Sequence, residues 1–228
     1  MLPTMTHLDA ELKSLKQDML EMFGLVKGQL EKSQDALVNF DKDLAREVRV
    51  HEKRVNSFEL KLDRDCENMI ALFNPVAVDL RFVLACLKIN MNLERIGDIA
   101  DGIAQFVLSI KSEPDQEFLK NTRLVEMYET ANSILADVMQ SFETEDTKLA
   151  RSIFKKDEVL DEINLAANNA VATFIKTNNS KINQSLYMLS TIRKLERVGD
   201  QSKNIAEEII FYIEAKVLKH KHKTIKQA

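Results

Sequence analysis

A six-residue motif that occurs twice limits the folds open to this chain of 228 residues. Leu93–Asp98 (LERIGD) returns 102 residues later as Leu195–Asp200 (LERVGD), with five of the six positions identical. Two smaller matches accompany it: Ile103-Ala104 with Ile205-Ala206, and Leu44–Arg46 with Leu149–Arg151. Self-similarity at a fixed spacing indicates a duplicated structural unit. We therefore predict two tandem units of similar fold.

The scarcity of helix-breaking residues predicts what each unit is made of. The chain has only 5 Gly and 3 Pro, the residues that tight turns require. Clusters of turn and cap residues stand at five places: 39–41, 74–75, 111–115, 143–145 and 178–180. They leave six helical stretches, three on each side of Pro114, with Gly24 and Gly28 inside the first. The predicted fold is all-α, with two tandem pseudo-repeated three-helix bundles (six long helices) over residues 1–112 and 113–228.

The break at Asn74-Pro75 also predicts how the third helix begins. Asn is a favoured N-cap residue, and Pro is favoured at the first helical position because its missing N–H is not needed there. We therefore expect Asn74 to cap the third helix and Pro75 to open it. The helix is expected to run to about Ser109.

In each repeat, acidic residues continue an apolar stripe of the third helix. The stripe of the first repeat is Leu80, Leu84, Leu87 and Met91, and the next steps reach Glu94 and Asp98. The stripe of the second repeat is Ile182, Leu186 and Leu189, followed by Arg193, Glu196 and Asp200. Helical spacing places each set on one face, so the acids are expected to point into the bundle. Arg193 stands where the first repeat has Met91, and its charge would partly neutralise the second site.

Carboxylates on an inward face are costly unless they are paired or bind cations. The second helices supply more acids near the same seam, Glu52 in the first repeat and Asp157 and Asp161 in the second. At an offset of 105 residues, Glu52 corresponds to Asp157 and Asn56 to Asp161. Clustered Asp and Glu oxygens suit cations such as Mg²⁺, Mn²⁺ or Fe. The sequence therefore predicts carboxylate metal sites.

A simpler interpretation of the motif remains open. Acids four residues apart are common on solvated helix faces, and each Glu has an adjacent arginine, Arg95 or Arg197. Gly97 and Gly199 argue against this, because glycine inside a helix costs about 1 kcal/mol. A close helix approach or a ligand contact would explain both glycines.

Charge and cysteine content exclude several classes of function. The formal net charge is −4, which disfavours nucleic-acid binding through a broad basic face. No apolar run is long enough for a membrane span, and the first 12 residues lack a hydrophobic signal region, so we expect a cytoplasmic protein. The two cysteines, Cys66 and Cys86, lie within apolar helical patterns and are expected to be buried thiols.

The repeated motif and three flanking segments resemble the PhoU family of phosphate-transport regulators. The segments are Asn74–Arg81, Asn204–Glu208 and His7–Leu12, and the resemblance covers roughly residues 5 to 217. It implies two three-helix bundles with multinuclear metal sites that take Fe, Zn, Mn or Mg. The metal role is carried over to seven acids: Glu94, Asp98, Glu196, Asp200, Glu52, Asp157 and Asp161. Asn56 stands where the second repeat has Asp161, and its neutral amide would affect the number of metal ions or the metal affinity at the first site.

The resemblance also implies a non-enzymatic role. Such a protein negatively controls phosphate uptake and phosphate-starvation signalling through contacts with the ATPase subunit of a phosphate transporter (PstB-like) and a sensor histidine kinase (PhoR-like). A homodimer is expected, with at most peripheral membrane association and no nucleic-acid partner. The basic tail, residues 216–226, would contribute a weak contact with an acidic partner or anionic lipid.

Two alternatives stay open. One is a metal-free helical scaffold or adaptor, in which the motif acids form only ion pairs. The other is a carboxylate-bridged di-metal enzyme, whose four-helix site uses Glu-x-x-His on two helices. The four histidines are His7, His51, His220 and His222, and none has Glu three residues before it. The chain also lacks a P-loop and a GxSxG motif, so no enzymatic activity is expected.

Overall fold

The computed structural model describes residues 7–218, which form seven α-helices and no strand. The elements are α1 (His7–Val38), α2 (Lys42–Phe73), α3 (Ala77–Ser109), α4 (Gln116–Asn121), α5 (Leu124–Thr144), α6 (Thr147–Thr177), a 3-10 turn η1 (Asn179–Lys181) and α7 (Ile182–Glu214). The all-α class and the six long helices are confirmed. The short α4 and η1 were not predicted: α4 directly follows the predicted break at 111–115, and η1 overlaps the predicted break at 178–180. The basic segment 219–226 lies outside the described residues.

Aspartate caps place the second helix of each repeat. The Asp41 side chain accepts hydrogen bonds from the backbone N–H groups of residues 43 and 44 and starts α2. The Asp146 side chain does the same for residues 148 and 149 and starts α6. Each carboxylate satisfies N–H groups that have no partner inside the helix. The 105-residue offset between Asp41 and Asp146 is the offset between Glu52 and Asp157, so each pair occupies the same level of its helix.

The predicted start of the third helix is wrong. Asn74 does not cap α3; it ends α2 in the left-handed conformation, with φ 47° and ψ 55°. Asn tolerates this conformation better than most residues, and a residue before proline is disfavoured in the right-handed helical region. Pro75 therefore follows the end of α2, and α3 begins at Ala77 after the extended residue Val76.

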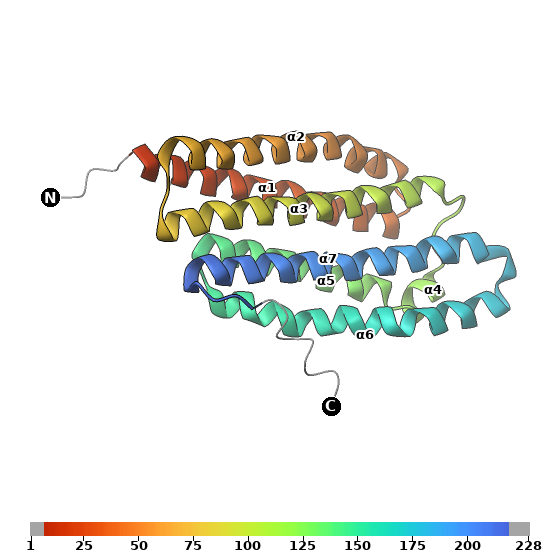
Figure 1. The fold of residues 1–228 in the computed structure, drawn as a ribbon. Coiled ribbons are helices and arrows are strands. Elements are labelled where there is room, and N and C mark those ends of the chain that lie inside the picture. The colour runs from red at the N-terminus through yellow and green to blue at the C-terminus, as the bar shows by residue number, and fades with distance from the viewer. Residues whose placement is uncertain (1–6, 219–228) are drawn as a thin grey trace, which may run out of the picture.

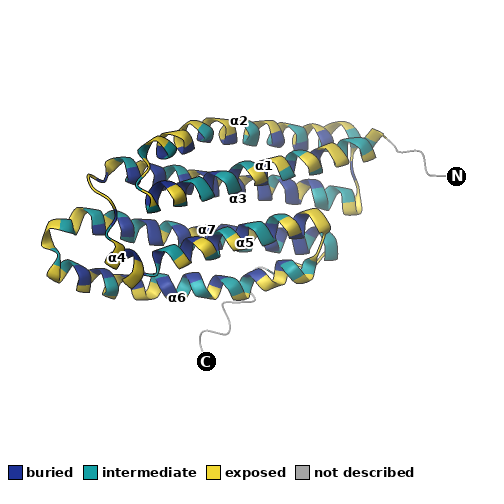
Figure 2. Cartoon of the chain, turned by 180° about the vertical axis from the view of Figure 1, so that it is seen from behind, coloured by how far each residue is buried: buried dark blue, intermediate teal, exposed yellow. Residues whose placement is uncertain are grey.

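The six long helices form two groups of three that lie against each other (Figure 1). The helices α2, α3, α7 and α6 contact one another in that order, α1 packs on α2 and α3, and α5 packs on α6 and α7. The groups meet where α3 contacts α7 and α1 contacts α5. One hydrophobic cluster runs through both groups, and Figure 2 shows its buried residues on the inner sides of the helices. The division into domains 1–112 and 113–228 stays a prediction.

Four aromatic rings join the two groups at one end of the molecule. Phe142 on α5 lies 5.6 Å from Phe23 on α1, 6.1 Å from Phe82 on α3 and 6.2 Å from Tyr212 on α7, measured between ring centroids. Phe82 and Tyr212 pack edge to face at 5.4 Å. Each group contributes two rings, so this cluster belongs to a core that the groups share.

The apolar stripes predicted to face the core lie at its edge instead: Leu87 and Leu189 pack against the core, but other members are exposed. Leu84 is 37% exposed and Met91 is 42% exposed, and in the second repeat Leu186 is 50% exposed. The helix α3 contacts α1, α2 and α7, so its buried positions extend around two sides and leave this stripe at the edge. The helix α7 is placed in the same way against α3, α5 and α6.

Two predictions about composition hold within residues 7–218. Cys66 and Cys86 are buried and form no disulfide. None of the described helices has an apolar stretch of the length and hydropathy needed to cross a membrane.

Candidate metal centre

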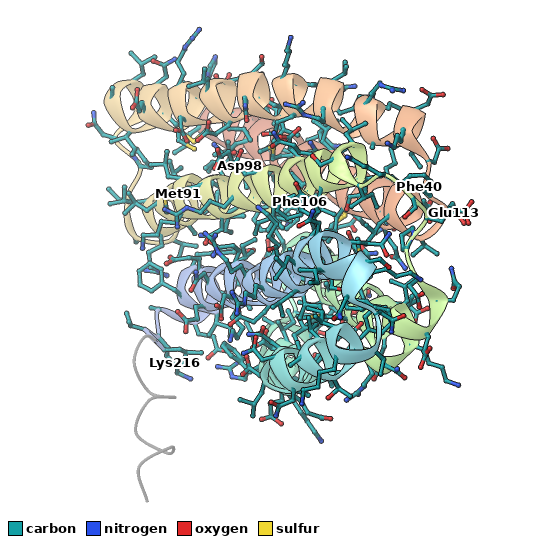
Figure 3. The ribbon with its side chains drawn as sticks, turned by 90° about the vertical axis from the view of Figure 1, so that its right-hand side faces the viewer. Phe40, Met91, Asp98, Phe106, Glu113 and Lys216 are labelled. Atoms are coloured by element: carbon teal, nitrogen blue, oxygen red, sulfur yellow. The ribbon has the colours of Figure 1, made fainter. Side chains whose placement is uncertain are left out.

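The first acidic cluster lies between α2 and α3. The charges of Asp98 and Glu94, both on α3, act on the carboxyl group of Glu52 on α2, as does the charge of Asp101. Glu59, also on α2, interacts electrostatically with Glu94 and Asp98. Asp98 and the stripe residue Met91 both lie on α3 (Figure 3). The structure therefore groups the three acids predicted for the first site.

Glu52 is the buried member of this cluster, with only 8% of its surface exposed. Its Oε2 accepts a hydrogen bond of 2.7 Å from Nε2 of Gln29 on α1. Its Oε1 is buried and has no hydrogen-bond partner. Burial raises the pKa of Glu52 from 4.5 to about 7, and the negative charges of Asp98, Asp101 and Glu94 add to this shift. A proton or a bound cation would relieve the unpaired oxygen.

Replacing Glu52 by glutamine is expected to stabilise the metal-free protein at high pH only. The folded state binds more protons at residue 52 than the unfolded state between about pH 4.5 and 7, so stability falls as pH rises through this window. Glu52→Gln removes that loss and should raise the free energy of unfolding at pH 8 by on the order of 2 kcal/mol, with no gain at pH 4. Urea unfolding in the presence of a chelator, at both pH values, measures the difference. Glu158→Gln, at an exposed position on α6, is the matched control, and an equal change in both variants would contradict the prediction.

The second acidic cluster lies between α6 and α7. Asp157 on α6 is only 2% exposed, and its Oδ1 is buried without a hydrogen-bond partner. Glu196 on α7 has its pKa raised by burial and by the charges of Asp200, Asp161 and Asp157. These are the four acids predicted for the second site. The Lys203 ammonium forms ion pairs with Asp157 and with Asp200, the latter at 2.8 Å.

The two motif glycines allow the buried acids to approach the third helices. A Cβ atom on Gly97 would lie 3.2 Å from Glu52 Oε2 and 3.2 Å from Gln29 Oε1. A Cβ atom on Gly199 would overlap Asp157 Oδ1 and lie 2.7 Å from Leu160 Cδ1. The close approach that the sequence offered as one explanation of both glycines is confirmed, and it is made by the acids themselves.

Several details of the predicted sites are wrong. Asp98 is exposed, and Glu94, Glu196 and Asp200 are only partly buried, because the stripe that carries the motif acids lies at the edge of the core. Asp161 on α6 is also only partly buried. The Arg193 side chain does not neutralise the second cluster.

Arg193 is exposed and donates a hydrogen bond of 3.2 Å to Asn168 on α6, and the positive charge in the cluster comes from Lys203 instead. The spacing of three residues between Asp200 and Lys203 is a helical ion-pair signal that the sequence carries. The contribution of Gln29 has no such signal, because Gln29 lies on another helix, 23 residues away from Glu52 in the sequence.

The residue types in both clusters suit a cation, but their side chains are not arranged to hold one. Both clusters contain hard carboxylate oxygens, and in each one carboxylate oxygen is buried without a hydrogen-bond partner. Among the described residues, however, no three His, Cys, Asp or Glu side chains are arranged so that they could hold a metal ion. Glu52, Glu94 and Asp98 would hold a cation in the first cluster, and a change of side-chain rotamers would be needed to bring their oxygens together.

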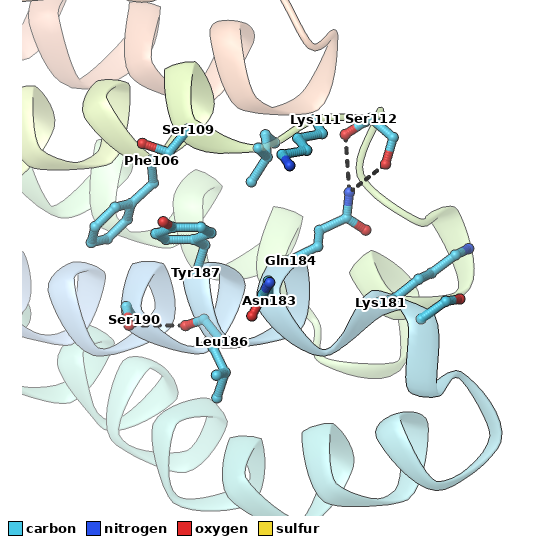
Figure 4. Close-up of a pocket in the computed structure, with 12 residues that line it drawn as sticks. Phe106, Ser109, Lys111, Ser112, Lys181, Asn183, Gln184, Leu186, Tyr187 and Ser190 are labelled. Atoms are coloured by element: carbon cyan, nitrogen blue, oxygen red, sulfur yellow. Dashed lines mark hydrogen bonds between the residues drawn. The ribbon is translucent and has the colours of Figure 1, made fainter.

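A separate pocket of about 570 Å³ lies where the end of α3 meets the start of α7 (Figure 4). Phe106 and Tyr187 line it, with ring centroids 5.3 Å apart. Gln184 also lines it and donates hydrogen bonds to the carbonyl oxygens of Ser112 and Glu113. None of the motif acids lines this pocket, so it is distinct from both acidic clusters.

Comparison with known proteins places both repeats in one family. The model of the PhoU domain matches residues 19–107 and 124–209. A PhoU homolog from Burkholderia is 33% identical over 216 residues, which cover 94% of this chain and 92% of that protein. The phosphate-specific transport system accessory protein PhoU of Escherichia coli is 32% identical over 212 residues, 93% of this chain and 87% of that protein.

Solved structures agree with this assignment. The crystal structure of PhoU from Pseudomonas aeruginosa superposes with a TM-score of 0.86 at 28% identity, covering 92% of this chain and 100% of that one. The phosphate transport system regulatory protein PhoU from Streptococcus pneumoniae gives 0.84 at 29% identity, covering 93% and 99%. The duplicated motif, the paired three-helix groups and these matches lead to one conclusion: the chain belongs to the PhoU domain family.

Proposed function

We propose that this protein is a regulatory accessory protein of phosphate transport that acts through protein contacts and not as an enzyme. The observation that carries the proposal is the PhoU domain match in both repeats, together with relatives named accessory proteins of the phosphate-specific transport system. In this role it restrains phosphate uptake and phosphate-starvation signalling, with a transporter ATPase subunit and a sensor histidine kinase as partners. We place it in the cytoplasm as a homodimer.

Complementation tests the regulatory role. A bacterial strain that lacks its own PhoU protein would receive this chain or an empty vector, and a phosphate-starvation reporter would be measured in phosphate-rich medium. A regulator should lower the reporter signal toward that of the parent strain, and the purified chain should bind the purified ATPase subunit or kinase. An unchanged signal with normal expression, and no binding to either protein, would contradict the proposal.

Metal binding at the acidic clusters is the second part of the proposal. The support is chemical: each cluster collects carboxylates from two helices, and each has a buried oxygen without a partner. A bound divalent cation, with Fe, Zn, Mn and Mg as candidates, would supply positive charge that holds neighbouring carboxylates together. Such binding to the folded state would stabilise it.

Removal of the motif acids is expected to abolish metal binding. Wild-type protein purified without an affinity tag or chelator should contain metal, and the Glu94/Asp98/Glu196/Asp200 quadruple alanine variant should contain almost none. At a metal concentration of about 100 times the dissociation constant, the wild type should gain about 2.7 kcal/mol of stability that the variant lacks. Elemental analysis and thermal melts with and without chelator give both readouts. A variant with alanine at four exposed acids outside the clusters, Asp35, Glu113, Glu117 and Glu143, is the control.

A second candidate is a metal-free helical scaffold. One observation favours it: as they stand, the described acids offer no group of three that could hold an ion. In that case wild-type protein would fail to take up metal, and the quadruple variant would melt at the same temperature with and without chelator. Regulation would then depend on protein contacts alone.

A further inference from the structure

At one pair of equivalent positions, the two acidic clusters carry opposite charges. The third helices of the two repeats correspond at an offset of 102 residues, which pairs Asp98 with Asp200 and Asp101 with Lys203. The first cluster therefore has a carboxylate where the second has an ammonium group. Asp101 adds to the negative charge around Glu52, whereas Lys203 subtracts from the negative charge around Asp157.

The contacts of Lys203 place its charge inside the second cluster. Its ammonium is paired both with Asp157, which is on α6 and almost fully buried, and with Asp200 on α7 at 2.8 Å. It thus bridges the two helices through the carboxylates that a metal ion would bridge. Only a quarter of the lysine side chain is exposed.

The first cluster has no cation in the equivalent place. Arg49 on α2 pairs with Asp101 at 3.2 Å, and it is not paired with Glu52, Glu94 or Asp98. Lys194 of α7 lies near Asp98 and Asp101 but packs over Gly102 and over the Phe106 ring, at 5.6 Å from the ring centroid, and forms none of the ion pairs within residues 7–218. Each cluster has one buried carboxylate oxygen without a partner, Oε1 of Glu52 and Oδ1 of Asp157, but the charges that act on Glu52 are those of Asp98, Asp101 and Glu94, all of them negative.

We propose that Lys203 acts as a tethered cation that occupies the second cluster, so that divalent metal binds selectively to the first cluster. Lys203 pairs with Oδ2 of Asp157 and Oδ1 of Asp200, so a metal ion that bound both acids would have to displace the ammonium from these oxygens or bind beside it through the remaining ones. In either case the charge of the ammonium would repel the metal ion. The first cluster, with Asp101 at the equivalent position, presents no such competitor. This inference deepens the proposed metal-binding function and rests on it.

Mn²⁺ uptake by paired variants tests the selectivity. Metal-free full-length protein would be titrated with Mn²⁺, and bound metal would be counted by elemental analysis after desalting. Glu94→Ala/Asp98→Ala should remove most of the bound Mn²⁺, while Glu196→Ala/Asp200→Ala should leave most of it in place. Lys203→Met keeps the length of the side chain without its charge, and it should add Mn²⁺ that binds about tenfold more tightly at the second cluster than in the wild type. Adding Glu196→Ala/Asp200→Ala to Lys203→Met should remove the added metal.

Two further variants test whether Mn²⁺ binding responds to the charge at this position or to any change of charge in the protein. Asp101→Lys places a lysine in the first cluster and should weaken its Mn²⁺ binding about tenfold. Lys156→Met removes a lysine that precedes Asp157 in the sequence but pairs with Asp137 on α5 and with none of the cluster acids, and it should leave Mn²⁺ binding unchanged. Circular dichroism and thermal melts with chelator show whether each variant is folded, independently of metal.

The outcomes distinguish this inference from the proposed function. If both clusters of the wild type bind Mn²⁺ equally and Lys203→Met changes nothing, the tethered-cation role is wrong while metal binding stands. If neither cluster binds Mn²⁺ in the wild type or in Lys203→Met, the proposed metal function fails, and the inference fails with it. Binding confined to the second cluster would overturn the inference alone.

Discussion

Replacing Phe142 by alanine is expected to lower the free energy of unfolding by about 3–5 kcal/mol. The ring is fully buried, and its neighbours Phe23, Phe82 and Tyr212 come from α1, α3 and α7. The truncation leaves a cavity where both three-helix groups meet, and no single helix can close it by moving alone. For a chain of this size the melting temperature should fall by roughly 10 °C. Calorimetry or urea unfolding of metal-free protein measures the loss.

Two controls make the Phe142 result specific. Phe142→Leu retains most of the buried volume and should cost about 1 kcal/mol. Leu165→Ala removes an apolar side chain that is 83% exposed and should change stability by less than about 0.5 kcal/mol. If Phe142→Ala were as mild as Leu165→Ala, the shared aromatic core would not hold the two groups together.

Gly199→Ala is expected to destabilise the protein by about 1–3 kcal/mol, although alanine is the better helix former. The new methyl group would overlap Asp157 Oδ1 and press on Leu160 Cδ1 at 2.7 Å. Neither neighbour can move freely, since Leu160 is fully buried and Asp157 is held by Lys203. Moving Asp157 would also disturb the ion pairs that bridge α6 and α7. Thermal unfolding of the metal-free protein measures the effect.

Other glycines of the chain supply the matched comparisons. At Gly97 the new methyl group would meet its three nearest atoms at 3.2 Å, and two of these belong to the longer side chains of Gln29 and Glu52. Gly97→Ala should therefore be much milder than Gly199→Ala. Gly24 is an exposed residue of α1 with no atom within 4 Å of a new Cβ, so Gly24→Ala should stabilise the protein by up to about 1 kcal/mol. Equal effects at all three positions would contradict the close approach at Gly199.

The sequence predicted the helices well because their signals are local. Helix breaks require specific residue types, and the predicted breaks at 39–41, 111–115, 143–145 and 178–180 all lie at or between helix ends. The Asn74-Pro75 break was placed correctly, but its role was reversed, since Asn can cap either end of a helix. The geometry that decides between these roles is the left-handed conformation at Asn74, which the residue types alone do not fix.

The sequence predicted those residues of the candidate site that the repeat reveals. Duplication identified Glu94, Asp98, Glu196 and Asp200, and the 105-residue offset found the buried pair Glu52 and Asp157. Gln29 was missed because it reaches Glu52 from α1, and no sequence spacing records that contact. Lys203 was missed although its spacing from Asp200 was visible, because the stripe was expected to point inward and Arg193 stood directly on it.

By itself, the sequence determined that this chain is a duplicated all-α protein and that the second and third helices of each repeat carry the acids. Helical periodicity and the repeat offset can both be read along the chain without knowledge of the packing. Only the tertiary structure decided which face of each third helix is buried. Because α3 and α7 each contact three helices, apolar residues occupy more than one side, and periodicity alone cannot choose among them. The packing also decided which charges meet, and it placed Lys203 against Asp157 while leaving one buried oxygen of Glu52 without a partner.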